Sequence, residues 1–420
     1  MKAEHLEDGL TMRNATERDI PALLEHFKVV HGVVVVDQLR TMLERYPRFS
    51  WEDSFIIEDI ESGKVVSCVI LLQNSWVLNG IEFPSVEMEA VGTLESHRYR
   101  GLIRLLNERF DERAAQLQPV IMTIAGIPYF YRNFGYEFAA RLGGGYPVNP
   151  SLMLKLKDGE EEPVTFELVD SGNFKEFLQF REKYLPSETW IRKIRPEDAD
   201  YLIYETSSHD QEAFFFYLVK EKGKTVGVFF LARWEKRMDI VELYLDNHLH
   251  VDPVLRFALN RAQEWEGIPV RVAPPNQLGV REYVSARAQL TTMVIGRYAW
   301  YVKIPSISRF IETVSPLFPE RLRSTEYHNF TGELTLTTYK EGFSITFEKG
   351  KFTGISVKEE REIGEYQLRI PMDSLTRLLM GYETLDELMN HEPDVQCAAP
   401  LRSLVRTLFP RLEAIVDPYY

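Results

Sequence analysis

The segment with the clearest chemical character is residues 91–103, which read VGTLESHRYRGLI. A β-rich run ends there in a basic turn, and an amphipathic helical pattern begins directly after the glycine. Backbone N–H groups and the helix dipole converge at such a point, so it can hold an anion such as a pyrophosphate. Arg98 and Arg100 add positive charge, and Gly101 permits close approach of the backbone. The alternative interpretation is an ordinary solvated helix start.

The elements expected around this turn follow a mixed α/β order. A strand over residues 10–16 precedes a helix over 20–30, whose start Thr16 can cap. Strands are predicted over 54–59, 64–77 and 81–93, and Asn79-Gly80 between the last two is a strong hairpin signal. A helix over 98–118, a strand over 119–124, an aromatic turn over 129–136 and a strand over 137–146 complete the unit.

The rest of the chain divides into two further regions. Glycines at 143–145 and a proline-containing stretch at 147–150 mark a first boundary. From Thr165 the pattern of strands and helices partly restarts, with a helix expected over 253–265, and this indicates a faint internal repeat. From Ile304 an antiparallel sheet with helices against it is expected. The predicted domains are therefore residues 1–147, 148–303 and 304–420.

Composition limits the class of protein. The chain has 420 residues, of which 45% are hydrophobic and 27% charged, and this is typical of a multidomain globular protein. No apolar run reaches membrane-helix length and the start is too acidic for a signal peptide, so a cytoplasmic location is expected. The net charge of -14 disfavours nucleic acid and is compatible with cationic substrates. Cys68 and Cys397 lie far apart without metal-ligand spacing, so neither a disulfide nor a metal site is expected.

Two short motifs resemble a known family. The run after the predicted strand is similar to the coenzyme A loop of the GNAT superfamily of N-acetyltransferases, Arg/Gln-x-x-Gly-x-Gly/Ala: Arg98 and Gly101 match, whereas Ile103 replaces the small last residue. Together, HRYRGL at 97–102 and YRNFGY at 131–136 resemble the enhanced-intracellular-survival (Eis-like) acetyltransferases, which tolerate a larger aliphatic residue there.

The resemblance implies a tandem of acetyltransferase folds followed by a sterol-carrier-like α+β domain. The second fold should be degenerate, because the helix expected near 251–265 has no Arg-x-x-Gly turn and should not bind coenzyme A. In the third region, LRIPMD at 368–373 and LLMG at 378–381 are similar to a sterol-carrier pattern. The alternative for that pattern is an amphipathic helix that closes a core.

For the cofactor, the resemblance implies acetyl-CoA. Backbone groups of Val91, Gly92 and Thr93 should pair with the pantetheine amides, and Gly126 and Ile127 should contact the same arm, although a hydroxyl residue of relatives is absent there. The residues expected to hold the pyrophosphate are Arg98, Tyr99, Arg100, Gly101, Leu102, Ile103 and Arg104.

Two catalytic residues are predicted from the same resemblance. Tyr131 matches the family's tyrosine acid, and a phenol with a pKa near 10 stays protonated at neutral pH; it could instead be one more member of an aromatic cluster. The carboxylate of the last residue, Tyr420, is the expected base, with a frayed terminus as the alternative. Glu87 and Glu89 on the preceding strand are competing bases.

The expected reaction is acetyl transfer to a primary amine. By resemblance the acceptor is a polycationic small molecule such as an aminoglycoside, or a lysine side chain of a protein, and the protein is a homo-oligomer, a hexamer in the family. Trp51, Glu52 and Asp53 could line an acceptor pocket. The alternative function is a lipid or sterol carrier in which the acetyltransferase folds serve as scaffold.

Overall fold

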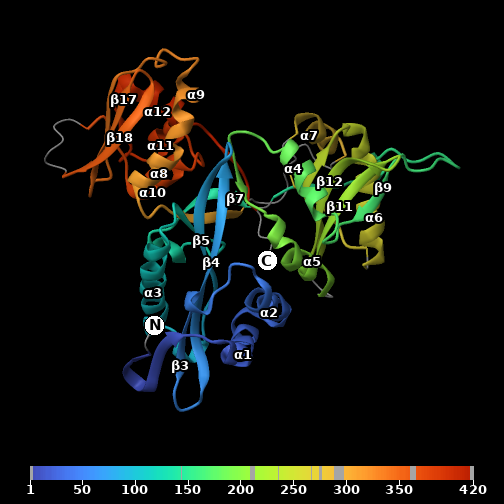
Figure 1. Ribbon diagram of the computed structural model, residues 1–420, viewed down its shortest axis with the longest axis horizontal. Helices are drawn as coiled ribbons and strands as arrows, with labels where there is room; N and C mark the ends of the chain where they lie inside the picture. The colour runs from blue at the N-terminus through green and yellow to red at the C-terminus, as the bar shows by residue number, and fades with distance from the viewer. Residues whose placement is uncertain are drawn as a thin grey trace.

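The computed structural model describes residues 3–142, 144–208, 213–234, 236–265, 267–273, 277–287, 298–359 and 366–416. Three β-sheets with their helices form three lobes, and the long hairpin of β4 and β5 rises between the other two lobes from the N-terminal one (Figure 1). The hairpin turn has the left-handed backbone at Asn79 (φ 48°) and Gly80 (φ 78°) that the Asn-Gly dipeptide predicts, so the predicted hairpin is confirmed.

The first sheet carries helices on both faces. Helices α1 (Ile20–His31) and α2 (Val36–Arg45) pack on one face, and α3 (Leu102–Leu117) packs on the other. The strands, in spatial order, are β1 (Glu4–His5), β2 (Leu10–Asn14), β3 (Ser54–Asp59), β4 (Lys64–Leu78), β5 (Ile81–Thr93), β6 (Ile121–Ile124), β15 (Tyr298–Lys303) and β7 (Glu137–Leu142).

Strand β15 enters this sheet from far along the chain. It lies between β6 and β7 and pairs antiparallel with both. Residues 298–303 fall within the predicted second domain, whereas in the structure they belong to the first sheet. A short strand has no local signal that states which sheet it joins, because its partners are more than 150 residues away. The three-domain division stays a prediction, except that residues 298–303 move from the second domain to the sheet of the first.

Two more strands from distant segments close the first sheet on itself. β10 (Thr189–Arg192) pairs with the outer end of β4, and β21 (Glu413–Ile415) pairs in parallel with β10. β21 also meets β7, because Arg141 Nη1 lies 2.7 Å and 2.6 Å from the two carboxylate oxygens of Glu413. The sheet is therefore curled so that its two edges come together at this ion pair.

The second sheet repeats the order of the first: a strand, two helices, three antiparallel strands, a helix and a parallel strand. The faint repeat seen in the sequence is thus confirmed as a structural one. Its strands are β8 (Tyr146–Pro147), β9 (Thr165–Leu168), β11 (Ala213–Glu221), β12 (Lys224–Trp234), β13 (Arg237–Leu245) and β14 (Val270–Val272), and its helices are α4 (Phe174–Lys183), α5 (Ala199–Ser208), α6 (Val251–Glu264) and α7 (Leu278–Ser285).

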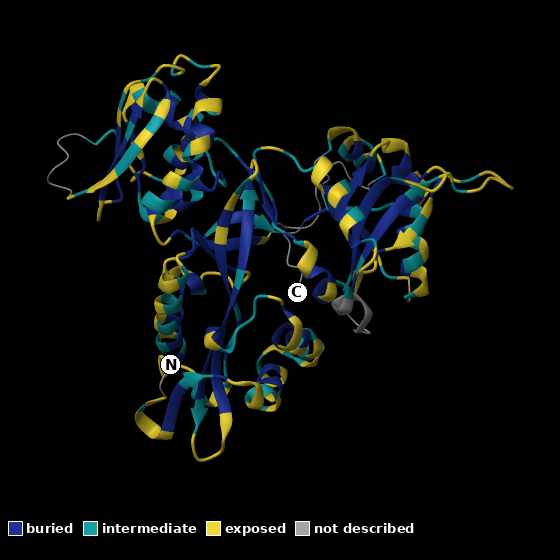
Figure 2. Cartoon of the chain, in the orientation of Figure 1, coloured by how far each residue is buried: buried dark blue, intermediate teal, exposed yellow. Residues whose placement is uncertain are grey.

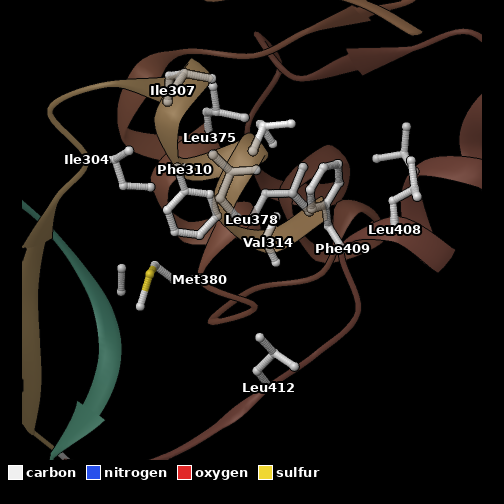
Figure 3. Close-up of a cluster of buried hydrophobic side chains, with 14 of the residues drawn as sticks. Ile304, Ile307, Phe310, Val314, Leu375, Leu378, Met380, Leu408, Phe409 and Leu412 are labelled. Carbon is white, nitrogen blue, oxygen red and sulfur yellow. The ribbon is translucent and has the colours of Figure 1, made fainter. Parts of the chain in front are cut away.

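The third sheet is the expected small sheet with helices against it, although one of its pairings, β16 with β19, is parallel. Apolar side chains of α8, α10 and α12 point toward one another in its core, among them Phe310, Leu378 and Leu408 (Figure 3). The strands are β16 (Gly332–Thr337), β17 (Gly342–Glu348), β18 (Lys351–Lys358), β19 (Leu368–Arg369) and β20 (Gln396–Cys397); the helices are α8 (Ile307–Val314), α9 (Phe318–Leu322), α10 (Met372–Leu379), α11 (Leu385–His391) and α12 (Arg402–Leu408).

The third core continues into the outer end of the β4–β5 hairpin. Figure 2 shows the strands of this hairpin largely buried along their length. The rings of Phe83 and Trp190 are 4.8 Å apart, and Trp190 lies 6.3 Å from Phe310 of α8. The Trp190 indole N–H also donates to the carbonyl of Met380 at 2.9 Å. Residues of all three regions therefore share one core at the hairpin tip.

Two further observations concern the part of the chain that the structure describes. It contains no helix that is both long and apolar enough to cross a membrane. It also contains no group of three or more His, Cys, Asp or Glu side chains that could hold a metal ion, and both cysteines are buried free thiols.

Candidate active site

Strands β5 and β6 separate on the first sheet. Their last paired residues are Glu87 and Thr123. Two strand positions further on, a β-bulge interrupts the pairing of β4 with β5, and Ala90 adopts a left-handed φ of 49°. Beyond Glu87, the β6-facing edge of β5 pairs with no strand among the described residues. The predicted pantetheine-binding residues Val91, Gly92 and Thr93 lie on this stretch of β5, where an extended ligand could pair with the strand edge. The Gly92 carbonyl already accepts a hydrogen bond from Ser67 Oγ at 3.0 Å.

Strand β5 leads through a short 3₁₀ turn, Glu95–His97, to the start of α3. Gly101 is the N-cap residue in the left-handed region (φ 77°), and nothing lies within 4 Å of the position where a side chain would begin. No side chain caps α3, and its first turn contains no acidic residue. The first N–H groups of a helix have no partner inside the helix, so those of Leu102, Ile103 and Arg104 are left for an external acceptor.

Arginines surround this helix start. Arg98 and Arg104 are exposed, and among the described residues no carboxylate lies within 4.0 Å of either guanidinium. Arg100 differs from the prediction, because its Nη2 already lies 2.6 Å from a carboxylate oxygen of Asp8. An uncapped helix start with two uncompensated cations fits an anionic group such as a pyrophosphate.

Tyr131 lies on the other side of the gap between β5 and β6. It belongs to the 3₁₀ turn Phe130–Phe134, which a bidentate ion pair between Arg132 and Glu137 holds to β7. The Tyr131 ring packs against Tyr301 of β15 at 5.6 Å. Gly126 is glycine for a steric reason, because a side chain at this position would overlap the Tyr131 ring. Ile127, by contrast, is exposed.

The environment of Tyr131 suits a proton donor. Burial and, to a smaller extent, the negative charge of Glu89 raise the pKa of the Tyr131 phenol far above its usual value near 10. The phenol therefore stays protonated throughout the neutral range. Of the two competing bases, Glu89 is thus the carboxylate whose charge reaches this tyrosine.

Comparison with known proteins identifies the domain that carries this site. Residues 11–139 match the model of the acetyltransferase (GNAT) domain. Residues 11–139 form a GNAT acetyltransferase domain. The protein is accordingly an N-acyltransferase. A comparison with curated proteins finds no match to the sequence.

Solved structures share the fold of the whole chain. A GCN5-related N-acetyltransferase from Anabaena variabilis ATCC 29413 has a TM-score of 0.68 and 16% identity, with 97% of this chain and 99% of that chain covered. A probable N-acyltransferase of unknown function from Enterococcus faecalis V583 has a TM-score of 0.69 and 15% identity, over 98% and 100% of the two chains. Eis1 from Mycobacterium abscessus has a TM-score of 0.60 and 12% identity, over 97% and 100%.

At these identities the likeness shows the fold alone. It confirms the predicted mixed α/β class and the Eis-like arrangement that accompanies the GNAT domain. The sterol-carrier character of the third region has no such support and stays a prediction.

The second copy of the fold has its corresponding site filled by its own side chains. Asp252 in the first turn of α6 is buried and makes a bidentate ion pair with Arg287, at 2.9 Å and 2.8 Å. A carboxylate thus occupies the helix start that is open in the GNAT domain. The Gln277 side chain also pairs with both the N–H and the C=O of Leu245 at the end of β13. These contacts explain why this copy is not expected to bind a nucleotide cofactor.

Glu87 of the GNAT domain is engaged in a buried polar cluster. Its carboxylate is fully buried, accepts a hydrogen bond from Asn74 Nδ2 at 2.6 Å and lies 3.2 Å from Arg192 Nη2 of β10. Three buried oxygens at neighbouring register positions, Asn74 Oδ1, Ser85 Oγ and Thr123 Oγ1, have no partner in the described part of the chain. Such atoms are normally satisfied by water or by a ligand.

Sequence reasoning missed Arg192, because it lies more than a hundred residues after Glu87 and only β10 brings the two together. The suggested acceptor-pocket residue Asp53 is instead buried, with its carboxylate bonded to Arg113 at 2.6 Å and to Gln73 at 2.9 Å. Trp51 packs on Phe49, and Glu52 lies 3.6 Å from Arg113. The predicted base Tyr420 lies outside the described residues.

The Glu87–Arg192 pair yields a stability prediction. Arg192→Met leaves the Glu87 carboxylate buried without the Arg192 counter-charge, and Glu87→Gln leaves the Arg192 guanidinium buried without the Glu87 counter-charge. Each single variant should lower the free energy of unfolding by about 3–5 kcal/mol. The double variant Glu87→Gln/Arg192→Met buries no lone charge and should recover much of the loss in melting temperature. Thermal unfolding of the four proteins measures this coupling. Additive losses in the double variant would contradict it.

Proposed function

We propose that this protein transfers an acetyl group from acetyl-CoA to a primary amine. The observation that carries the proposal is the start of α3 in the GNAT domain. It is uncapped, free of acidic residues and flanked by Arg98 and Arg104, which have no carboxylate partner among the described residues. In a chain with a net charge of -14, two uncompensated arginines at a helix start favour an anionic ligand.

The GNAT domain would bind the cofactor between the start of α3 and the open edge of β5. The N–H groups of Leu102, Ile103 and Arg104 and the guanidinium of Arg98 would hold the pyrophosphate. The open edge of β5 from Val91 to Thr93 would pair with the pantetheine arm, with Gly126 and Ile127 on the opposite side of the gap. Acetyl-CoA supplies the activated acyl group, as a thioester, and every other part of the chemistry falls to side chains of this protein.

Tyr131 is the proposed acid. Acetyl transfer breaks the bond from the acyl carbon to sulfur and forms one from that carbon to nitrogen, so a thiolate needs a proton as it departs. The Tyr131 phenol is protonated at neutral pH, because burial raises its pKa, and its hydroxyl has no hydrogen-bond partner among the described residues. It can therefore donate this proton without first breaking another bond.

A carboxylate is the proposed base, and the direction of β21 supports the one at Tyr420. β21 runs parallel to β10, and through β10 and β4 its residue Ile415 lies at the level of Glu82. From Glu413 to Ile415 the strand points along the sheet in the direction that leads on β5 from Glu82 to Glu87. Both intervals, 82–87 and 415–420, are five residues. A strand rises about 3.3 Å per residue, so about 17 Å of extended chain suffices to reach the level where β5 leaves β6. Glu89 is the competing base.

A cationic acceptor agrees with the charge around this gap. The partnerless oxygens of Asn74, Ser85 and Thr123 can accept hydrogen bonds from an amine, and Glu89 adds negative charge beside Tyr131. We propose a polycationic small molecule such as an aminoglycoside, or a lysine side chain of a protein, as acceptor. We further propose that the protein is cytoplasmic and forms a homo-oligomer, a hexamer by resemblance. Its proposed domains are 1–147, 148–303 and a sterol-carrier-like third domain, 304–420.

The carrier alternative has weaker support. The core of the third region is built from side chains of its own helices and of the β4–β5 hairpin, as the clustering of Ile307, Phe310 and Leu375 indicates (Figure 3). This core joins the third region to the GNAT sheet. A structural role in completing the enzyme accounts for it directly.

Calorimetry with acetyl-CoA tests the proposed function. One site per chain is expected, because Asp252 and Gln277 fill the corresponding positions of the second copy. Arg98→Ala should weaken binding roughly 10- to 150-fold, since a charge-assisted contact contributes about 1.5–3 kcal/mol. Arg323→Ala removes an exposed arginine of the third region and should leave the affinity unchanged. Absence of binding, or two sites per chain, would contradict the assignment.

Replacing the proposed acid should separate chemistry from binding. Tyr131→Phe removes only the hydroxyl, so acetyl-CoA affinity should stay as in the wild type while kcat falls about 100- to 10,000-fold. The wild-type rate should show no alkaline fall from ionisation of this phenol up to about pH 10, because its pKa is raised and the protonated form is the active one. Stopped-flow measurement of the chemical step checks both statements. An unchanged rate in Tyr131→Phe would show that Tyr131 is not the acid and only packs in the aromatic cluster.

The proposed base can be tested once intact-mass spectrometry has established the last residue of the purified protein. A short C-terminal extension turns the Tyr420 carboxylate into an amide, which cannot accept the proton, and should lower kcat with little change in acetyl-CoA affinity. The same extension at the N-terminus is the matched control. Full activity of the extended chain, together with loss of activity in Glu89→Gln, would assign the base to β5.

A further inference from the structure

The loop that leads into α3 holds an aromatic side chain whose conformation its own surroundings do not explain. Tyr99 is fully exposed and has a φ of 65°, in the left-handed region. This region is unfavourable for a non-glycine residue and is rare for bulky side chains. Such a conformation persists where surrounding contacts or a function compensate for it.

Two other described tyrosines with left-handed backbone show what such compensation looks like. Tyr339 (φ 64°) donates its hydroxyl to the carbonyl of Asp394 and its N–H to Thr337 Oγ1. Tyr129 (φ 71°) has the Arg132 guanidinium 6.0 Å from its ring centroid. In both cases the side chain has a partner within the protein.

Tyr99 has no partner of this kind. Among the described residues, nothing hydrogen-bonds its hydroxyl, stacks on its ring or places a cation over it. Its neighbours in the loop are Arg98 and the N-cap Gly101, which belong to the proposed pyrophosphate cradle. An unpartnered aromatic ring therefore stands at the edge of an anion site.

We infer that Tyr99 stacks on the adenine ring of coenzyme A. The ligand class follows from the chemistry: a group attached to a pyrophosphate and able to cover a tyrosine face is an aromatic base, and stacking on an aromatic side chain typically contributes about 1–3 kcal/mol per base. The inference rests on the proposed function, because it assumes that the cradle binds coenzyme A. It adds a residue that recognises the nucleotide end and does not touch the reacting atoms.

Two ligands separate this contact from the rest of the site. Coenzyme A carries the adenine, whereas 4′-phosphopantetheine lacks the whole adenosine part. Tyr99→Ala should weaken the binding of coenzyme A about 5- to 150-fold by calorimetry and leave the affinity for 4′-phosphopantetheine unchanged. Tyr99→Phe keeps the ring and should bind as the wild type does. In the wild-type complex the adenine protons should shift upfield in NMR spectra, and in Tyr99→Ala this shift should vanish.

A second variant tests the strain that suggested the role. Tyr99→Gly suits the left-handed backbone, so it should raise the melting temperature while it weakens coenzyme A. Tyr339→Gly, at the matched tyrosine of the third region, should leave coenzyme A binding unchanged.

The outcomes distinguish this inference from the proposed function. Wild-type protein that binds coenzyme A, with a Tyr99→Ala variant of equal affinity, overturns the stacking and leaves the proposed function standing. Equal weakening of both ligands in Tyr99→Ala also overturns it, since the residue would then act through the shape of the loop. Wild-type protein that does not bind coenzyme A overturns both.

Discussion

The pairing of β4 with β5 is the constraint on which the rest of the structure depends. The two strands have 15 and 13 residues, more than twice the usual length, and their two halves serve different purposes. The outer half is enclosed by β10 and the third core, through Phe83 and Trp190. The inner half carries the bulge at Ala90 and the open edge beside β6. Because one ladder contains both halves, the packing of the outer half fixes the geometry of the inner one.

The two copies of the fold differ by few side chains at the position of the proposed cofactor site. Both have three antiparallel strands, a helix and a parallel strand in the same order. In the second copy, Asp252 supplies the negative charge at the helix start and Gln277 supplies the amide that pairs with the strand edge. These two side chains occupy positions that no side chain of the described residues fills at the start of α3 and along the open edge of β5. The backbone alone therefore does not decide binding.

Most of the GNAT domain could be predicted from local sequence signals. The strands that pair with partners far along the chain could not. The Asn79-Gly80 turn, the period of α3 and the Arg98–Gly101 loop each act within a few residues, so the sequence could indicate them. Three short strands, β10, β15 and β21, pair with strands far along the chain. The sequence of a short apolar run does not indicate which strand it will pair with. Arg192 was missed for the same reason. Tyr99 was expected in the cradle, but only its φ and its exposure suggested a distinct role.

The strands that sequence reasoning missed are the ones that complete the enzyme. β15 supplies Tyr301, against which Tyr131 packs, and β10 supplies Arg192, which neutralises the buried Glu87 beside the open edge. β21 continues this arrangement, because it pairs with β10 and its Glu413 makes an ion pair with Arg141 of β7. Residues 1–147 alone would lack all three strands and would expose the apolar face around Trp76 and Phe83. The catalytic domain in the folding sense is therefore larger than the segment that the family motif marks, and the later regions act as parts of its sheet and core.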